Sequence, residues 1–312
     1  MKKLSICIPT FNRSKHVLEQ LDFLREEIIG FEDSVQIIVS DNCSNQSEVV
    51  KVKSYHNNNK FFQLFFQEVN LGLIGNTVFL LNNSISEFIW FVGDDDKLDS
   101  GILSLLFEIF NNYDDISYIF FNHDCFKNDI SNVVDTFNLS EFSGYHKTFG
   151  DNMLKILDYY GAINMFMTSN IYKRDVLLDG YRKFNRKPQI DDFLLFSFIC
   201  SSESATFIVD DVYVHDNYAE STWSNNARKI FSSSVPQRII DIEKLQLDKN
   251  NVKKTLFSFY YKGRGNFLYM MLNSPVKLTY KIFKFLGLSY CLRLFLRSFF
   301  INILRLTKSI KK

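Results

Sequence analysis

The sequence predicts an α/β fold in which a mainly parallel sheet is flanked by helices and followed by a basic helical region. Short apolar runs suited to buried strands alternate with segments of helical spacing over the first 122 residues. The predicted strands are 4–9, 35–39, 61–66, 88–92 and 116–121. Helix-length segments between strands favour parallel pairing, because a parallel crossover needs a dozen or more residues. Ligands of such sheets bind beyond the carboxyl ends of the strands.

The helices between these strands follow from apolar spacing and capping residues. The first is predicted over 15–29, directly after Ser14, whose hydroxyl can cap it. The other helices are predicted over 74–81, 102–110 and 192–200. Residues 123–190 are less regular and rich in turns, so we expect an insertion or second half that shapes a pocket. A further strand is predicted over 206–214.

The charge is divided unevenly along the chain. The 312 residues sum to a formal net charge of +1, but residues 249–312 contain 14 lysines and arginines and no acidic residue. Residues 1–248 therefore hold 22 basic and 35 acidic residues, a net charge of −13. An acidic body with a basic tail suggests contact with an anionic surface, either nucleic acid or membrane.

The composition excludes several classes of protein. A hydrophobic content of 46% with 33 phenylalanines excludes a disordered chain. The five cysteines are odd in number and widely spaced, without a CxxC pair, so we expect no disulfide framework or structural zinc and favour a reducing compartment. No run reaches the roughly 20 predominantly apolar residues of a spanning helix.

Three adjacent carboxylates, Asp94, Asp95 and Asp96, directly follow the strand predicted at 88–92. Neighbouring carboxylates repel one another unless a cation or hydrogen-bond donors neutralise them. Mn²⁺ or Mg²⁺ suits such oxygen ligands and bridges them to substrate phosphates. The alternative is a solvated acidic turn that caps the helix beginning near Ser100.

Polar residues also follow each of the first three predicted strands. Thr10, Asn12 and Arg13 can contact a nucleotide base and phosphate, or they can form a turn that caps the next helix. Asp41 can accept from a base N–H, although an Asx turn is the simpler interpretation. The segment from Asn70 supplies a tight turn and the start of a helix.

These motifs together resemble family 2 glycosyltransferases of the GT-A fold, a Rossmann-like fold, of the kind that build bacterial surface polysaccharides such as O-antigen or capsule. The carrying segments are SICIPTFNR at 5–13, IIVSDNCS at 37–44, NLGLIGN at 70–76 and WFVGDDDKL at 90–98. The resemblance covers roughly residues 1–220 and is strongest over the first 100. It implies an inverting, hexosyltransferase-like transfer of a sugar from a nucleoside diphosphate donor to a glycan hydroxyl, with Mn²⁺ or Mg²⁺.

The resemblance also assigns site residues by position. It places nine residues in the donor nucleotide pocket: Pro9, Thr10, Asn12, Arg13, Asp41, Asn70, Gly72, Asp94 and Asp95. Asp94 and Asp96 match the ends of the family's DXD motif. Asp94 then lies nearer the ribose and can share the metal, Asp96 binds the metal, and Asp95 shares either role.

An acidic pair on a later helix completes the resemblance. The family usually has Glu-Asp there, with the Asp as general base, whereas this chain has Asp191-Asp192. By position Asp192 is the base, and the departure leaves Asp191 as the other candidate. The alternative is an acidic helix cap. His215 follows the strand predicted at 206–214 and can complete the metal shell or touch the diphosphate, or it can be a structural histidine.

The basic tail predicts helices that lie in a membrane interface. Basic residues recur beside an aromatic and aliphatic face, at Lys277, Lys281, Lys284, Arg293, Arg297 and Arg305. This pattern favours an anionic membrane surface, with a packed bundle helix as the alternative. Nucleic acid is not expected as a partner, since no known reader motif is present. The family's acceptors are often lipid-linked, so we expect a polyprenyl-diphosphate-linked acceptor and a cytoplasmic enzyme, peripheral on the inner face of the cell membrane.

The sequence thus predicts a GT-A domain over 1–220, with a nucleotide-binding half at 1–122 and an acceptor and catalytic half at 123–220. A helical region follows at 221–312, in which 276–312 form the membrane-interface helices. A sugar-nucleotide pyrophosphorylase is a second possibility, although that class needs a glycine-rich basic loop after the first strand. A non-catalytic nucleotide-sugar-binding subunit is a third, and the intact acidic motifs argue against it.

Overall fold

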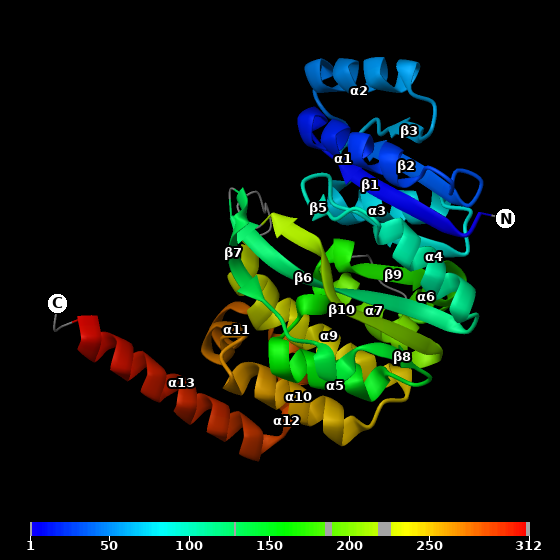
Figure 1. The fold of residues 1–312 in the computed structure, drawn as a ribbon. Helices are drawn as coiled ribbons and strands as arrows, with labels where there is room; N and C mark the ends of the chain where they lie inside the picture. Colours follow the sequence, from blue (N-terminus) through cyan, green and yellow to red (C-terminus); the bar gives the residue numbers. More distant parts are fainter. Residues whose placement is uncertain (1, 128, 185–188, 218–225, 310–312) are drawn as a thin grey trace. The chain divides into compact units, whose positions relative to one another are not determined.

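The structure is a computed structural model in which a ten-stranded sheet lies at the centre of the first of two units (Figure 1). The structure describes residues 2–127, 129–184, 189–217 and 226–309, without the side chains of 129 and 301–309. The first unit contains residues 1–149 and 164–221. The second contains residues 150–163 and 222–312.

The elements of the first unit alternate between strands and helices over its amino-terminal part. Its strands are β1 (Leu4–Thr10), β2 (Val35–Asp41), β3 (Gln63–Phe66), β4 (Phe88–Phe91), β5 (Lys97–Leu98), β6 (Ile116–Lys127), β7 (Asp129–Thr136), β8 (Gly144–His146), β9 (Asn170–Lys173) and β10 (Ala205–Asn217). Its helices are α1 (Ser14–Glu27), α2 (Gln46–Asn58), α3 (Gly72–Asn83), α4 (Ile102–Asn112), η1 (Ser140–Phe142), η3 (Met167–Ser169), α6 (Arg174–Arg182) and α7 (Asp192–Glu203). The predicted α/β class, with a sheet flanked by helices, is confirmed.

The sheet has the order β3-β2-β1-β4-β9-β6-β10-β5, with β7 paired to β6 and β8 to β10. Strands β3, β2, β1 and β4 pair in parallel, as do β6 and β10. Strand β9 is antiparallel to both β4 and β6, so it joins the two parallel parts. Parallel pairing brings the carboxyl ends of β1, β2 and β4 to one edge of the sheet.

Both faces of the central strands are buried, which explains their continuous apolar sequence. Alternate side chains of a strand point to opposite faces. On β1, Leu4, Ile6 and Ile8 belong to one core cluster together with apolar residues of α1 and α4. On the other face Phe91 of β4 meets the Phe193 ring of α7 at a centroid distance of 6.1 Å. Burying each such side chain contributes roughly 1.5–3 kcal/mol to folding.

Two segments of the chain differ from expectation. Helix α2 was not predicted, because it buries only Val49 and Val52 and shows little apolar periodicity, although the Asn45 side chain caps it by accepting from Glu48 N. Residues 123–190 are also more regular than expected. They contain the end of β6 and the strands β7, β8 and β9, and β7 is rich in polar residues. Short or polar elements carry little periodic signal in the sequence.

The second unit is helical. Its elements are α5 (Gly150–Tyr160), α8 (Ala227–Lys229), η6 (Ile230–Ser234), α9 (Val235–Asp241), η7 (Ile242–Leu245), α10 (Lys249–Tyr261), α11 (Phe267–Asn273), α12 (Val276–Leu286) and α13 (Leu288–Ser309), with η2 (Ile163–Met165) at the junction of the two units. Helix α10 packs against α5, α9, α12 and α13. Among the described residues, none of the helices combines the length and apolarity needed to cross a membrane.

Helices α12 and α13 bury one side and expose another. Ile282, Leu286, Cys291 and Leu294 are buried. Large apolar side chains on other positions of α13 are exposed, namely Leu288, Leu292, Phe295, Leu296, Phe299 and Phe300. Helix α13 (red in Figure 1) therefore carries an exposed apolar stripe through its described side chains.

Some basic residues of α12 and α13 contact other side chains, and others are exposed. Lys281 Nζ lies 2.7 Å from Asp241 Oδ1, and the Arg297 guanidinium lies 4.7 Å from the Tyr261 ring centroid. Lys277, Lys284 and Arg293 are exposed. The side chain of Arg305, also part of the predicted stripe, and residues 310–312 lie outside what the structure describes.

Burial of His123 on β6 makes the first unit sensitive to acid. Burial lowers the pKa of His123 to about 3, from 6.5, so the folded protein keeps the ring neutral. The unfolded chain takes up a proton near pH 6.5, so the stabilising effect is complete above that pH and is lost as the pH falls toward 3. Between pH 7.5 and 5.5 we expect the free energy of unfolding of His123→Gln to fall by about 1 kcal/mol less than that of the wild type. Urea unfolding at both pH values measures it, and equal pH dependence in both proteins would contradict it.

Candidate functional site

The loops that follow β1, β2 and β4 meet at the carboxyl edge of the sheet. The register pairs Pro9 with Ser40 and Thr10 with Asp41, and Asn42 N donates to Thr10 O at 2.9 Å. Beyond the β1–β4 ladder, Val92 N donates to Cys7 O at 3.0 Å, so the turn at 93–96 begins beside the end of β1. The sequence predicted this meeting from the polar clusters alone.

Thr10 and Arg13 contact the acidic turn directly. The Thr10 hydroxyl donates to Asp94 Oδ2 at 2.6 Å. Arg13 Nη1 donates to Asp95 Oδ2 at 2.6 Å and lies 3.3 Å from Asp94 Oδ1. The hydroxyl and guanidinium assigned to a nucleotide thus bind two carboxylates in this structure, which supplies part of the neutralisation that adjacent carboxylates need.

Asp96 is held by Thr168, a residue that sequence reasoning missed. The Thr168 hydroxyl donates to Asp96 Oδ2 and accepts from Gly93 N at 2.9 Å, while Thr168 O accepts from Trp90 Nε1 at 2.7 Å. A side chain on Gly93 would collide with the Asp96 carboxylate, so the turn needs glycine there. Thr168 lies 72 positions from Asp96, and no local motif marks it.

Burial and mutual repulsion raise the pKa values of these acids. Burial, and then the charge of Asp95, raise the pKa of Asp94 to about 6 despite its bonds to Thr10 and Arg13. The same causes, with the charge of Asp216, hold the pKa of Asp96 well above its ordinary value. Asp216 on β10, not singled out from the sequence, has a pKa raised to about 6, chiefly by burial. The folded protein therefore concentrates buried negative charge around this turn.

This arrangement fits a divalent cation by its chemistry. Carboxylate oxygens are the ligands that Mg²⁺ and Mn²⁺ prefer, and a cation would relieve the repulsion that raises the pKa of Asp94 and Asp96. In the described part of the chain, no three histidine, cysteine, aspartate or glutamate side chains already stand in a metal-holding arrangement. Mg²⁺ typically takes only one or two protein carboxylates, together with water and substrate phosphates.

The residues predicted to bind the nucleotide in the loops after β1 and β2 form hydrogen bonds with these loops themselves. Asp41 Oδ1 accepts from Ser44 N at 2.8 Å, which is the Asx turn considered as the alternative. Asn12 has a left-handed backbone with φ 55°, and its Oδ1 accepts from Asn45 N at 2.8 Å. These bonds fix the loops after β1 and β2 to each other. A role for Asp41 in base recognition stays a prediction.

The turn before α3 is tied to the same loop. Asn42 Nδ2 donates to Asn70 Oδ1 at 3.0 Å, and Asn70 Oδ1 also accepts from Gly72 N at 2.8 Å. Gly72 has φ 71°, a conformation that glycine adopts without the strain of other residues. The sequence indicated the turn and the glycine, and missed Asn42 as the side chain that connects them.

The acidic pair lies at the start of α7, and both residues are buried. Asp192 Oδ2 accepts from the Tyr181 hydroxyl at 2.6 Å and from Gln189 N at 2.8 Å. Asp191 occupies the N-cap position of α7. Its side chain forms no capping hydrogen bond with the described residues, whereas Asp192 lies in the first turn of α7, where the helix dipole favours an acid. The role of either Asp as a base stays a prediction.

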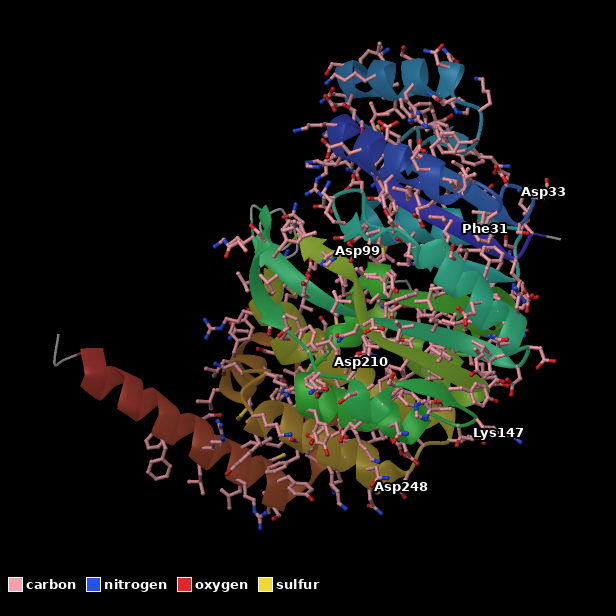
Figure 2. All side chains as sticks on the ribbon, viewed as in Figure 1. Phe31, Asp33, Asp99, Lys147, Asp210 and Asp248 are labelled. Atoms are coloured by element: carbon pink, nitrogen blue, oxygen red, sulfur yellow. The ribbon has the colours of Figure 1, made fainter. Side chains whose placement is uncertain are left out.

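His215 on β10 lies between two carboxylates. Its Nδ1 is 2.7 Å from Asp124 Oδ1 on β6, and its Nε2 is 3.3 Å from Asp99 Oδ2 (Asp99 is labelled in Figure 2). Asp99 follows β5, which pairs with β10 through Val214 and His215. No residue pattern in the sequence linked Asp124 or Asp99 to His215.

Comparison with known families identifies the chain. A sequence model described as "Glycosyl transferase family 2" matches residues 5–177, more than half of the chain. The chain belongs to glycosyl transferase family 2. The match includes the acidic turn and the loops after β1 and β2, so the predicted family is confirmed.

Two curated relatives of this family 2 chain match it over shorter segments. A protein of Campylobacter jejuni named GalNAc(5)-diNAcBac-PP-undecaprenol beta-1,3-glucosyltransferase is 31% identical over 108 residues, which are 35% of this chain and 34% of the relative. The abequosyltransferase RfbV of Salmonella typhimurium is 29% identical over 104 residues, or 33% of this chain and 31% of the relative. The chain thus spans about a third of the length of the curated relatives it matches.

Solved structures with low sequence identity share the fold. Residues 1–349 of S. aureus TarS, in complex with UDP-GlcNAc, match 91% of this chain and 80% of that chain, with a TM-score of 0.64 and 15% identity. The mannosyltransferase PcManGT of Pyrobaculum calidifontis, in complex with GDP-Man and Mn²⁺, matches 96% of this chain and 85% of that chain, with a TM-score of 0.52 and 11% identity. The predicted GT-A fold class is confirmed by these neighbours.

Proposed function

We propose that this chain is an inverting, metal-dependent glycosyltransferase of the hexosyltransferase type. It moves a sugar from a nucleoside diphosphate donor to a hydroxyl of a glycan acceptor in bacterial surface polysaccharide biosynthesis, such as O-antigen or capsule. The observation that carries the proposal is the buried acidic turn at 94–96, bound by Thr10 and Arg13 at the carboxyl edge of the sheet. Family membership over residues 5–177 supports the reaction class.

The donor and acceptor classes are supported by the names of similar proteins. Two structural neighbours bind UDP-GlcNAc and GDP-Man, which supports a nucleoside diphosphate sugar as the donor of this chain. One curated relative acts on a glycan joined to PP-undecaprenol. We therefore propose a polyprenyl-diphosphate-linked acceptor for this chain.

We assign donor binding, proton removal and charge neutralisation to different residues. Pro9, Thr10, Asn12, Arg13, Asp41, Asn70, Gly72, Asp94 and Asp95 bind and orient the donor nucleotide. Asp192, or Asp191 if the register of the pair differs, removes the proton from the acceptor hydroxyl as its oxygen attacks the anomeric carbon. In-line attack opposite the leaving diphosphate inverts that carbon. A divalent cation, Mn²⁺ or Mg²⁺, held by Asp96 and Asp94 with His215 would neutralise the charge that develops on the leaving group.

A panel of nucleotide sugars with Mn²⁺ and a polyprenyl-diphosphate-linked acceptor tests this function. Mass spectrometry should detect a product heavier by one sugar residue, with release of the nucleoside diphosphate. Formation of a nucleotide sugar from a nucleoside triphosphate and a sugar phosphate would instead identify a pyrophosphorylase. Donor binding without hydrolysis or transfer over the whole panel would identify a non-catalytic subunit.

We further propose that the enzyme is cytoplasmic and peripheral on the inner face of the cell membrane. The exposed apolar stripe of α13 lies on a chain segment that has no acidic residue after Asp248. Exposed basic and apolar side chains on one helical region suit an anionic lipid interface. The ion pair of Lys281 with Asp241 limits the contributing cations to exposed ones such as Lys277, Lys284 and Arg293.

Removing these three charges is expected to weaken membrane binding. The triple variant Lys277→Gln, Lys284→Gln and Arg293→Gln should bind anionic vesicles about 100-fold less well, since each cation near the surface contributes about 1 kcal/mol. Vesicle flotation with phosphatidylglycerol measures the effect. The control replaces three exposed lysines of the first unit, Lys15, Lys51 and Lys147, with glutamine. Equal flotation of both triple variants would contradict the proposed surface.

A further inference from the structure

The first and last carboxylates of the acidic turn are held in different ways. Both oxygens of Asp94 contact protein donors, since Oδ2 accepts from the Thr10 hydroxyl at 2.6 Å and Oδ1 accepts from Arg13 Nη1 at 3.3 Å. Asp96 is bound at Oδ2, by the Thr168 hydroxyl. Asp96 therefore keeps one carboxylate oxygen, Oδ1, that accepts no hydrogen bond from the described residues.

Asp96 Oδ1 reaches the solvent, although the residue as a whole is only 6% exposed. Among the described side chains, the buried oxygens that lack a hydrogen-bond partner do not include Asp96 Oδ1, so this unbonded oxygen is accessible. A Cβ on Gly93 would collide with Oδ2 and would lie 3.5 Å from Oδ1. The oxygen held by Thr168 is therefore turned toward the chain, and the other oxygen is the one that a ligand can reach.

The Thr168 side chain is itself fixed on more than one side. Thr168 is fully buried, and its Oγ1 accepts from Gly93 N at 2.9 Å, which leaves the hydroxyl proton to donate to Asp96. Its backbone oxygen accepts from Trp90 Nε1 at 2.7 Å. A β-branched side chain also has few rotamers to choose from. These bonds join η3 to β4 and to the turn that follows it, so the hydroxyl has a fixed position relative to Asp96.

We propose that Thr168 is a positioning residue, which holds Asp96 Oδ2 so that Oδ1 stays available to the divalent cation of the donor site. Carboxylates that bind metals are commonly hydrogen-bonded by residues that do not touch the metal, and loss of such a partner typically weakens metal binding 10–100-fold. The inference rests on the proposed function for the identity of the site. The competing possibility is that the Thr168 hydroxyl only stabilises the fold, by joining η3 to Gly93 N.

The Mn²⁺ affinity of variants at position 168 tests the proposal without relying on sugar transfer. Electron paramagnetic resonance of free Mn²⁺, in the presence of UDP or GDP, should show about 10-fold weaker binding in Thr168→Val, which keeps the shape of the side chain and loses the hydroxyl. Thr168→Ser keeps the hydroxyl and should bind Mn²⁺ nearly as the wild type does. Unchanged affinity in Thr168→Val, or an equal loss in Thr168→Ser, would overturn the positioning role.

Ser169→Ala is the matched control, because Ser169 is the next residue of η3, is equally buried, and has its hydroxyl 2.9 Å from His123 Nδ1 rather than beside an acid. It should lower the urea midpoint, as Thr168→Val does, and keep the Mn²⁺ affinity. An equal loss of affinity in Ser169→Ala would assign the effect to the packing of η3 and overturn the proposal.

Thr168→Ala is a second variant without the hydroxyl, and its smaller side chain leaves room for a water at Gly93 N. It should show the same loss of Mn²⁺ affinity, so the test stands even if Thr168→Val does not fold. The expected Mn²⁺ affinities in all variants, combined with no sugar transfer by the wild type, would contradict only the proposed function.

Discussion

Asp96→Ala is expected to lower sugar transfer by about 10³-fold and to weaken metal-dependent nucleotide binding severely. Asp96 is the carboxylate proposed to hold the cation, and Thr168 orients it from η3. Its loss would leave the charge on the departing diphosphate without a counter-ion. Turnover with the best donor of the panel, and isothermal titration of the nucleotide with and without Mn²⁺, measure the two effects.

The companion variant Asp96→Asn separates loss of the metal ligand from loss of structure. Burial and neighbouring carboxylates hold the pKa of Asp96 well above its ordinary value, so its ionised form destabilises the folded protein. Stability from this group falls as the pH rises above the ordinary value of 3.8, and a neutral amide removes that effect. We therefore expect Asp96→Asn to be inactive and yet more stable than the wild type at pH 8 in the absence of metal.

Asp114→Ala is the matched control for both substitutions. Asp114 is exposed and lies just before the amino end of β6, whereas the acidic turn lies at the carboxyl ends of the strands. Asp114→Ala should keep activity, nucleotide binding and stability. Full transfer activity in Asp96→Ala would remove Asp96 from the mechanism.

Asp192→Asn is expected to lower transfer by about 10²–10⁴-fold while nucleotide binding in the presence of Mn²⁺ stays near the wild-type level. An amide cannot take the proton of the acceptor hydroxyl, whereas the acidic turn proposed to bind the donor is unaltered. Single-turnover kinetics at saturating donor and acceptor measure the chemical step. Normal turnover in Asp192→Asn would show that its buried carboxylate serves only its hydrogen bonds with Tyr181 and Gln189.

Two further variants decide which member of the pair acts and exclude an indirect effect. Asp191→Asn should retain transfer if Asp192 is the base, and the reverse result would assign the role to Asp191. Tyr181→Phe removes the 2.6 Å hydrogen bond to Asp192 Oδ2 and leaves the carboxylate in place. It should cost about 1 kcal/mol of stability and keep most of the activity. A loss in Tyr181→Phe as large as in Asp192→Asn would indicate that the orientation of Asp192 matters as much as its charge.

The sequence predicted the elements whose signals are local. Strands β1, β2 and β4 are buried on both faces, so their apolar runs stand out, and the polar residues that end them mark the edge of the sheet where we propose that the donor binds. The DDD motif and the glycine at position 72 were recognisable because they too are local signals in the sequence. Their nucleotide-binding roles stay predictions.

The remaining features depend on contacts between distant parts of the chain. Thr168 reaches Asp96 across 72 positions, and Asp124 reaches His215 across 91. Neither residue stands in a motif, so one sequence gives no reason to select it. Helix α2 was missed because its few buried residues produce little periodicity. The antiparallel strand β9 was missed because it has only four residues, of which only Ile171 and Tyr172 are apolar.

Strand β9 is translated after both of the strands that it joins, so the sheet has open strand edges during synthesis on the ribosome. Strand β9 lies between β4 and β6, yet it is translated after both, and β10 follows it. A nascent chain of 122 residues would present β4 with one open edge and β6 without either of its central neighbours. Open strand edges pair readily with other chains, and pairings between distant residues form slowly. We expect chaperones to be needed until residues 170–217 have emerged, and expression of fragment 1–122 alone to yield aggregates.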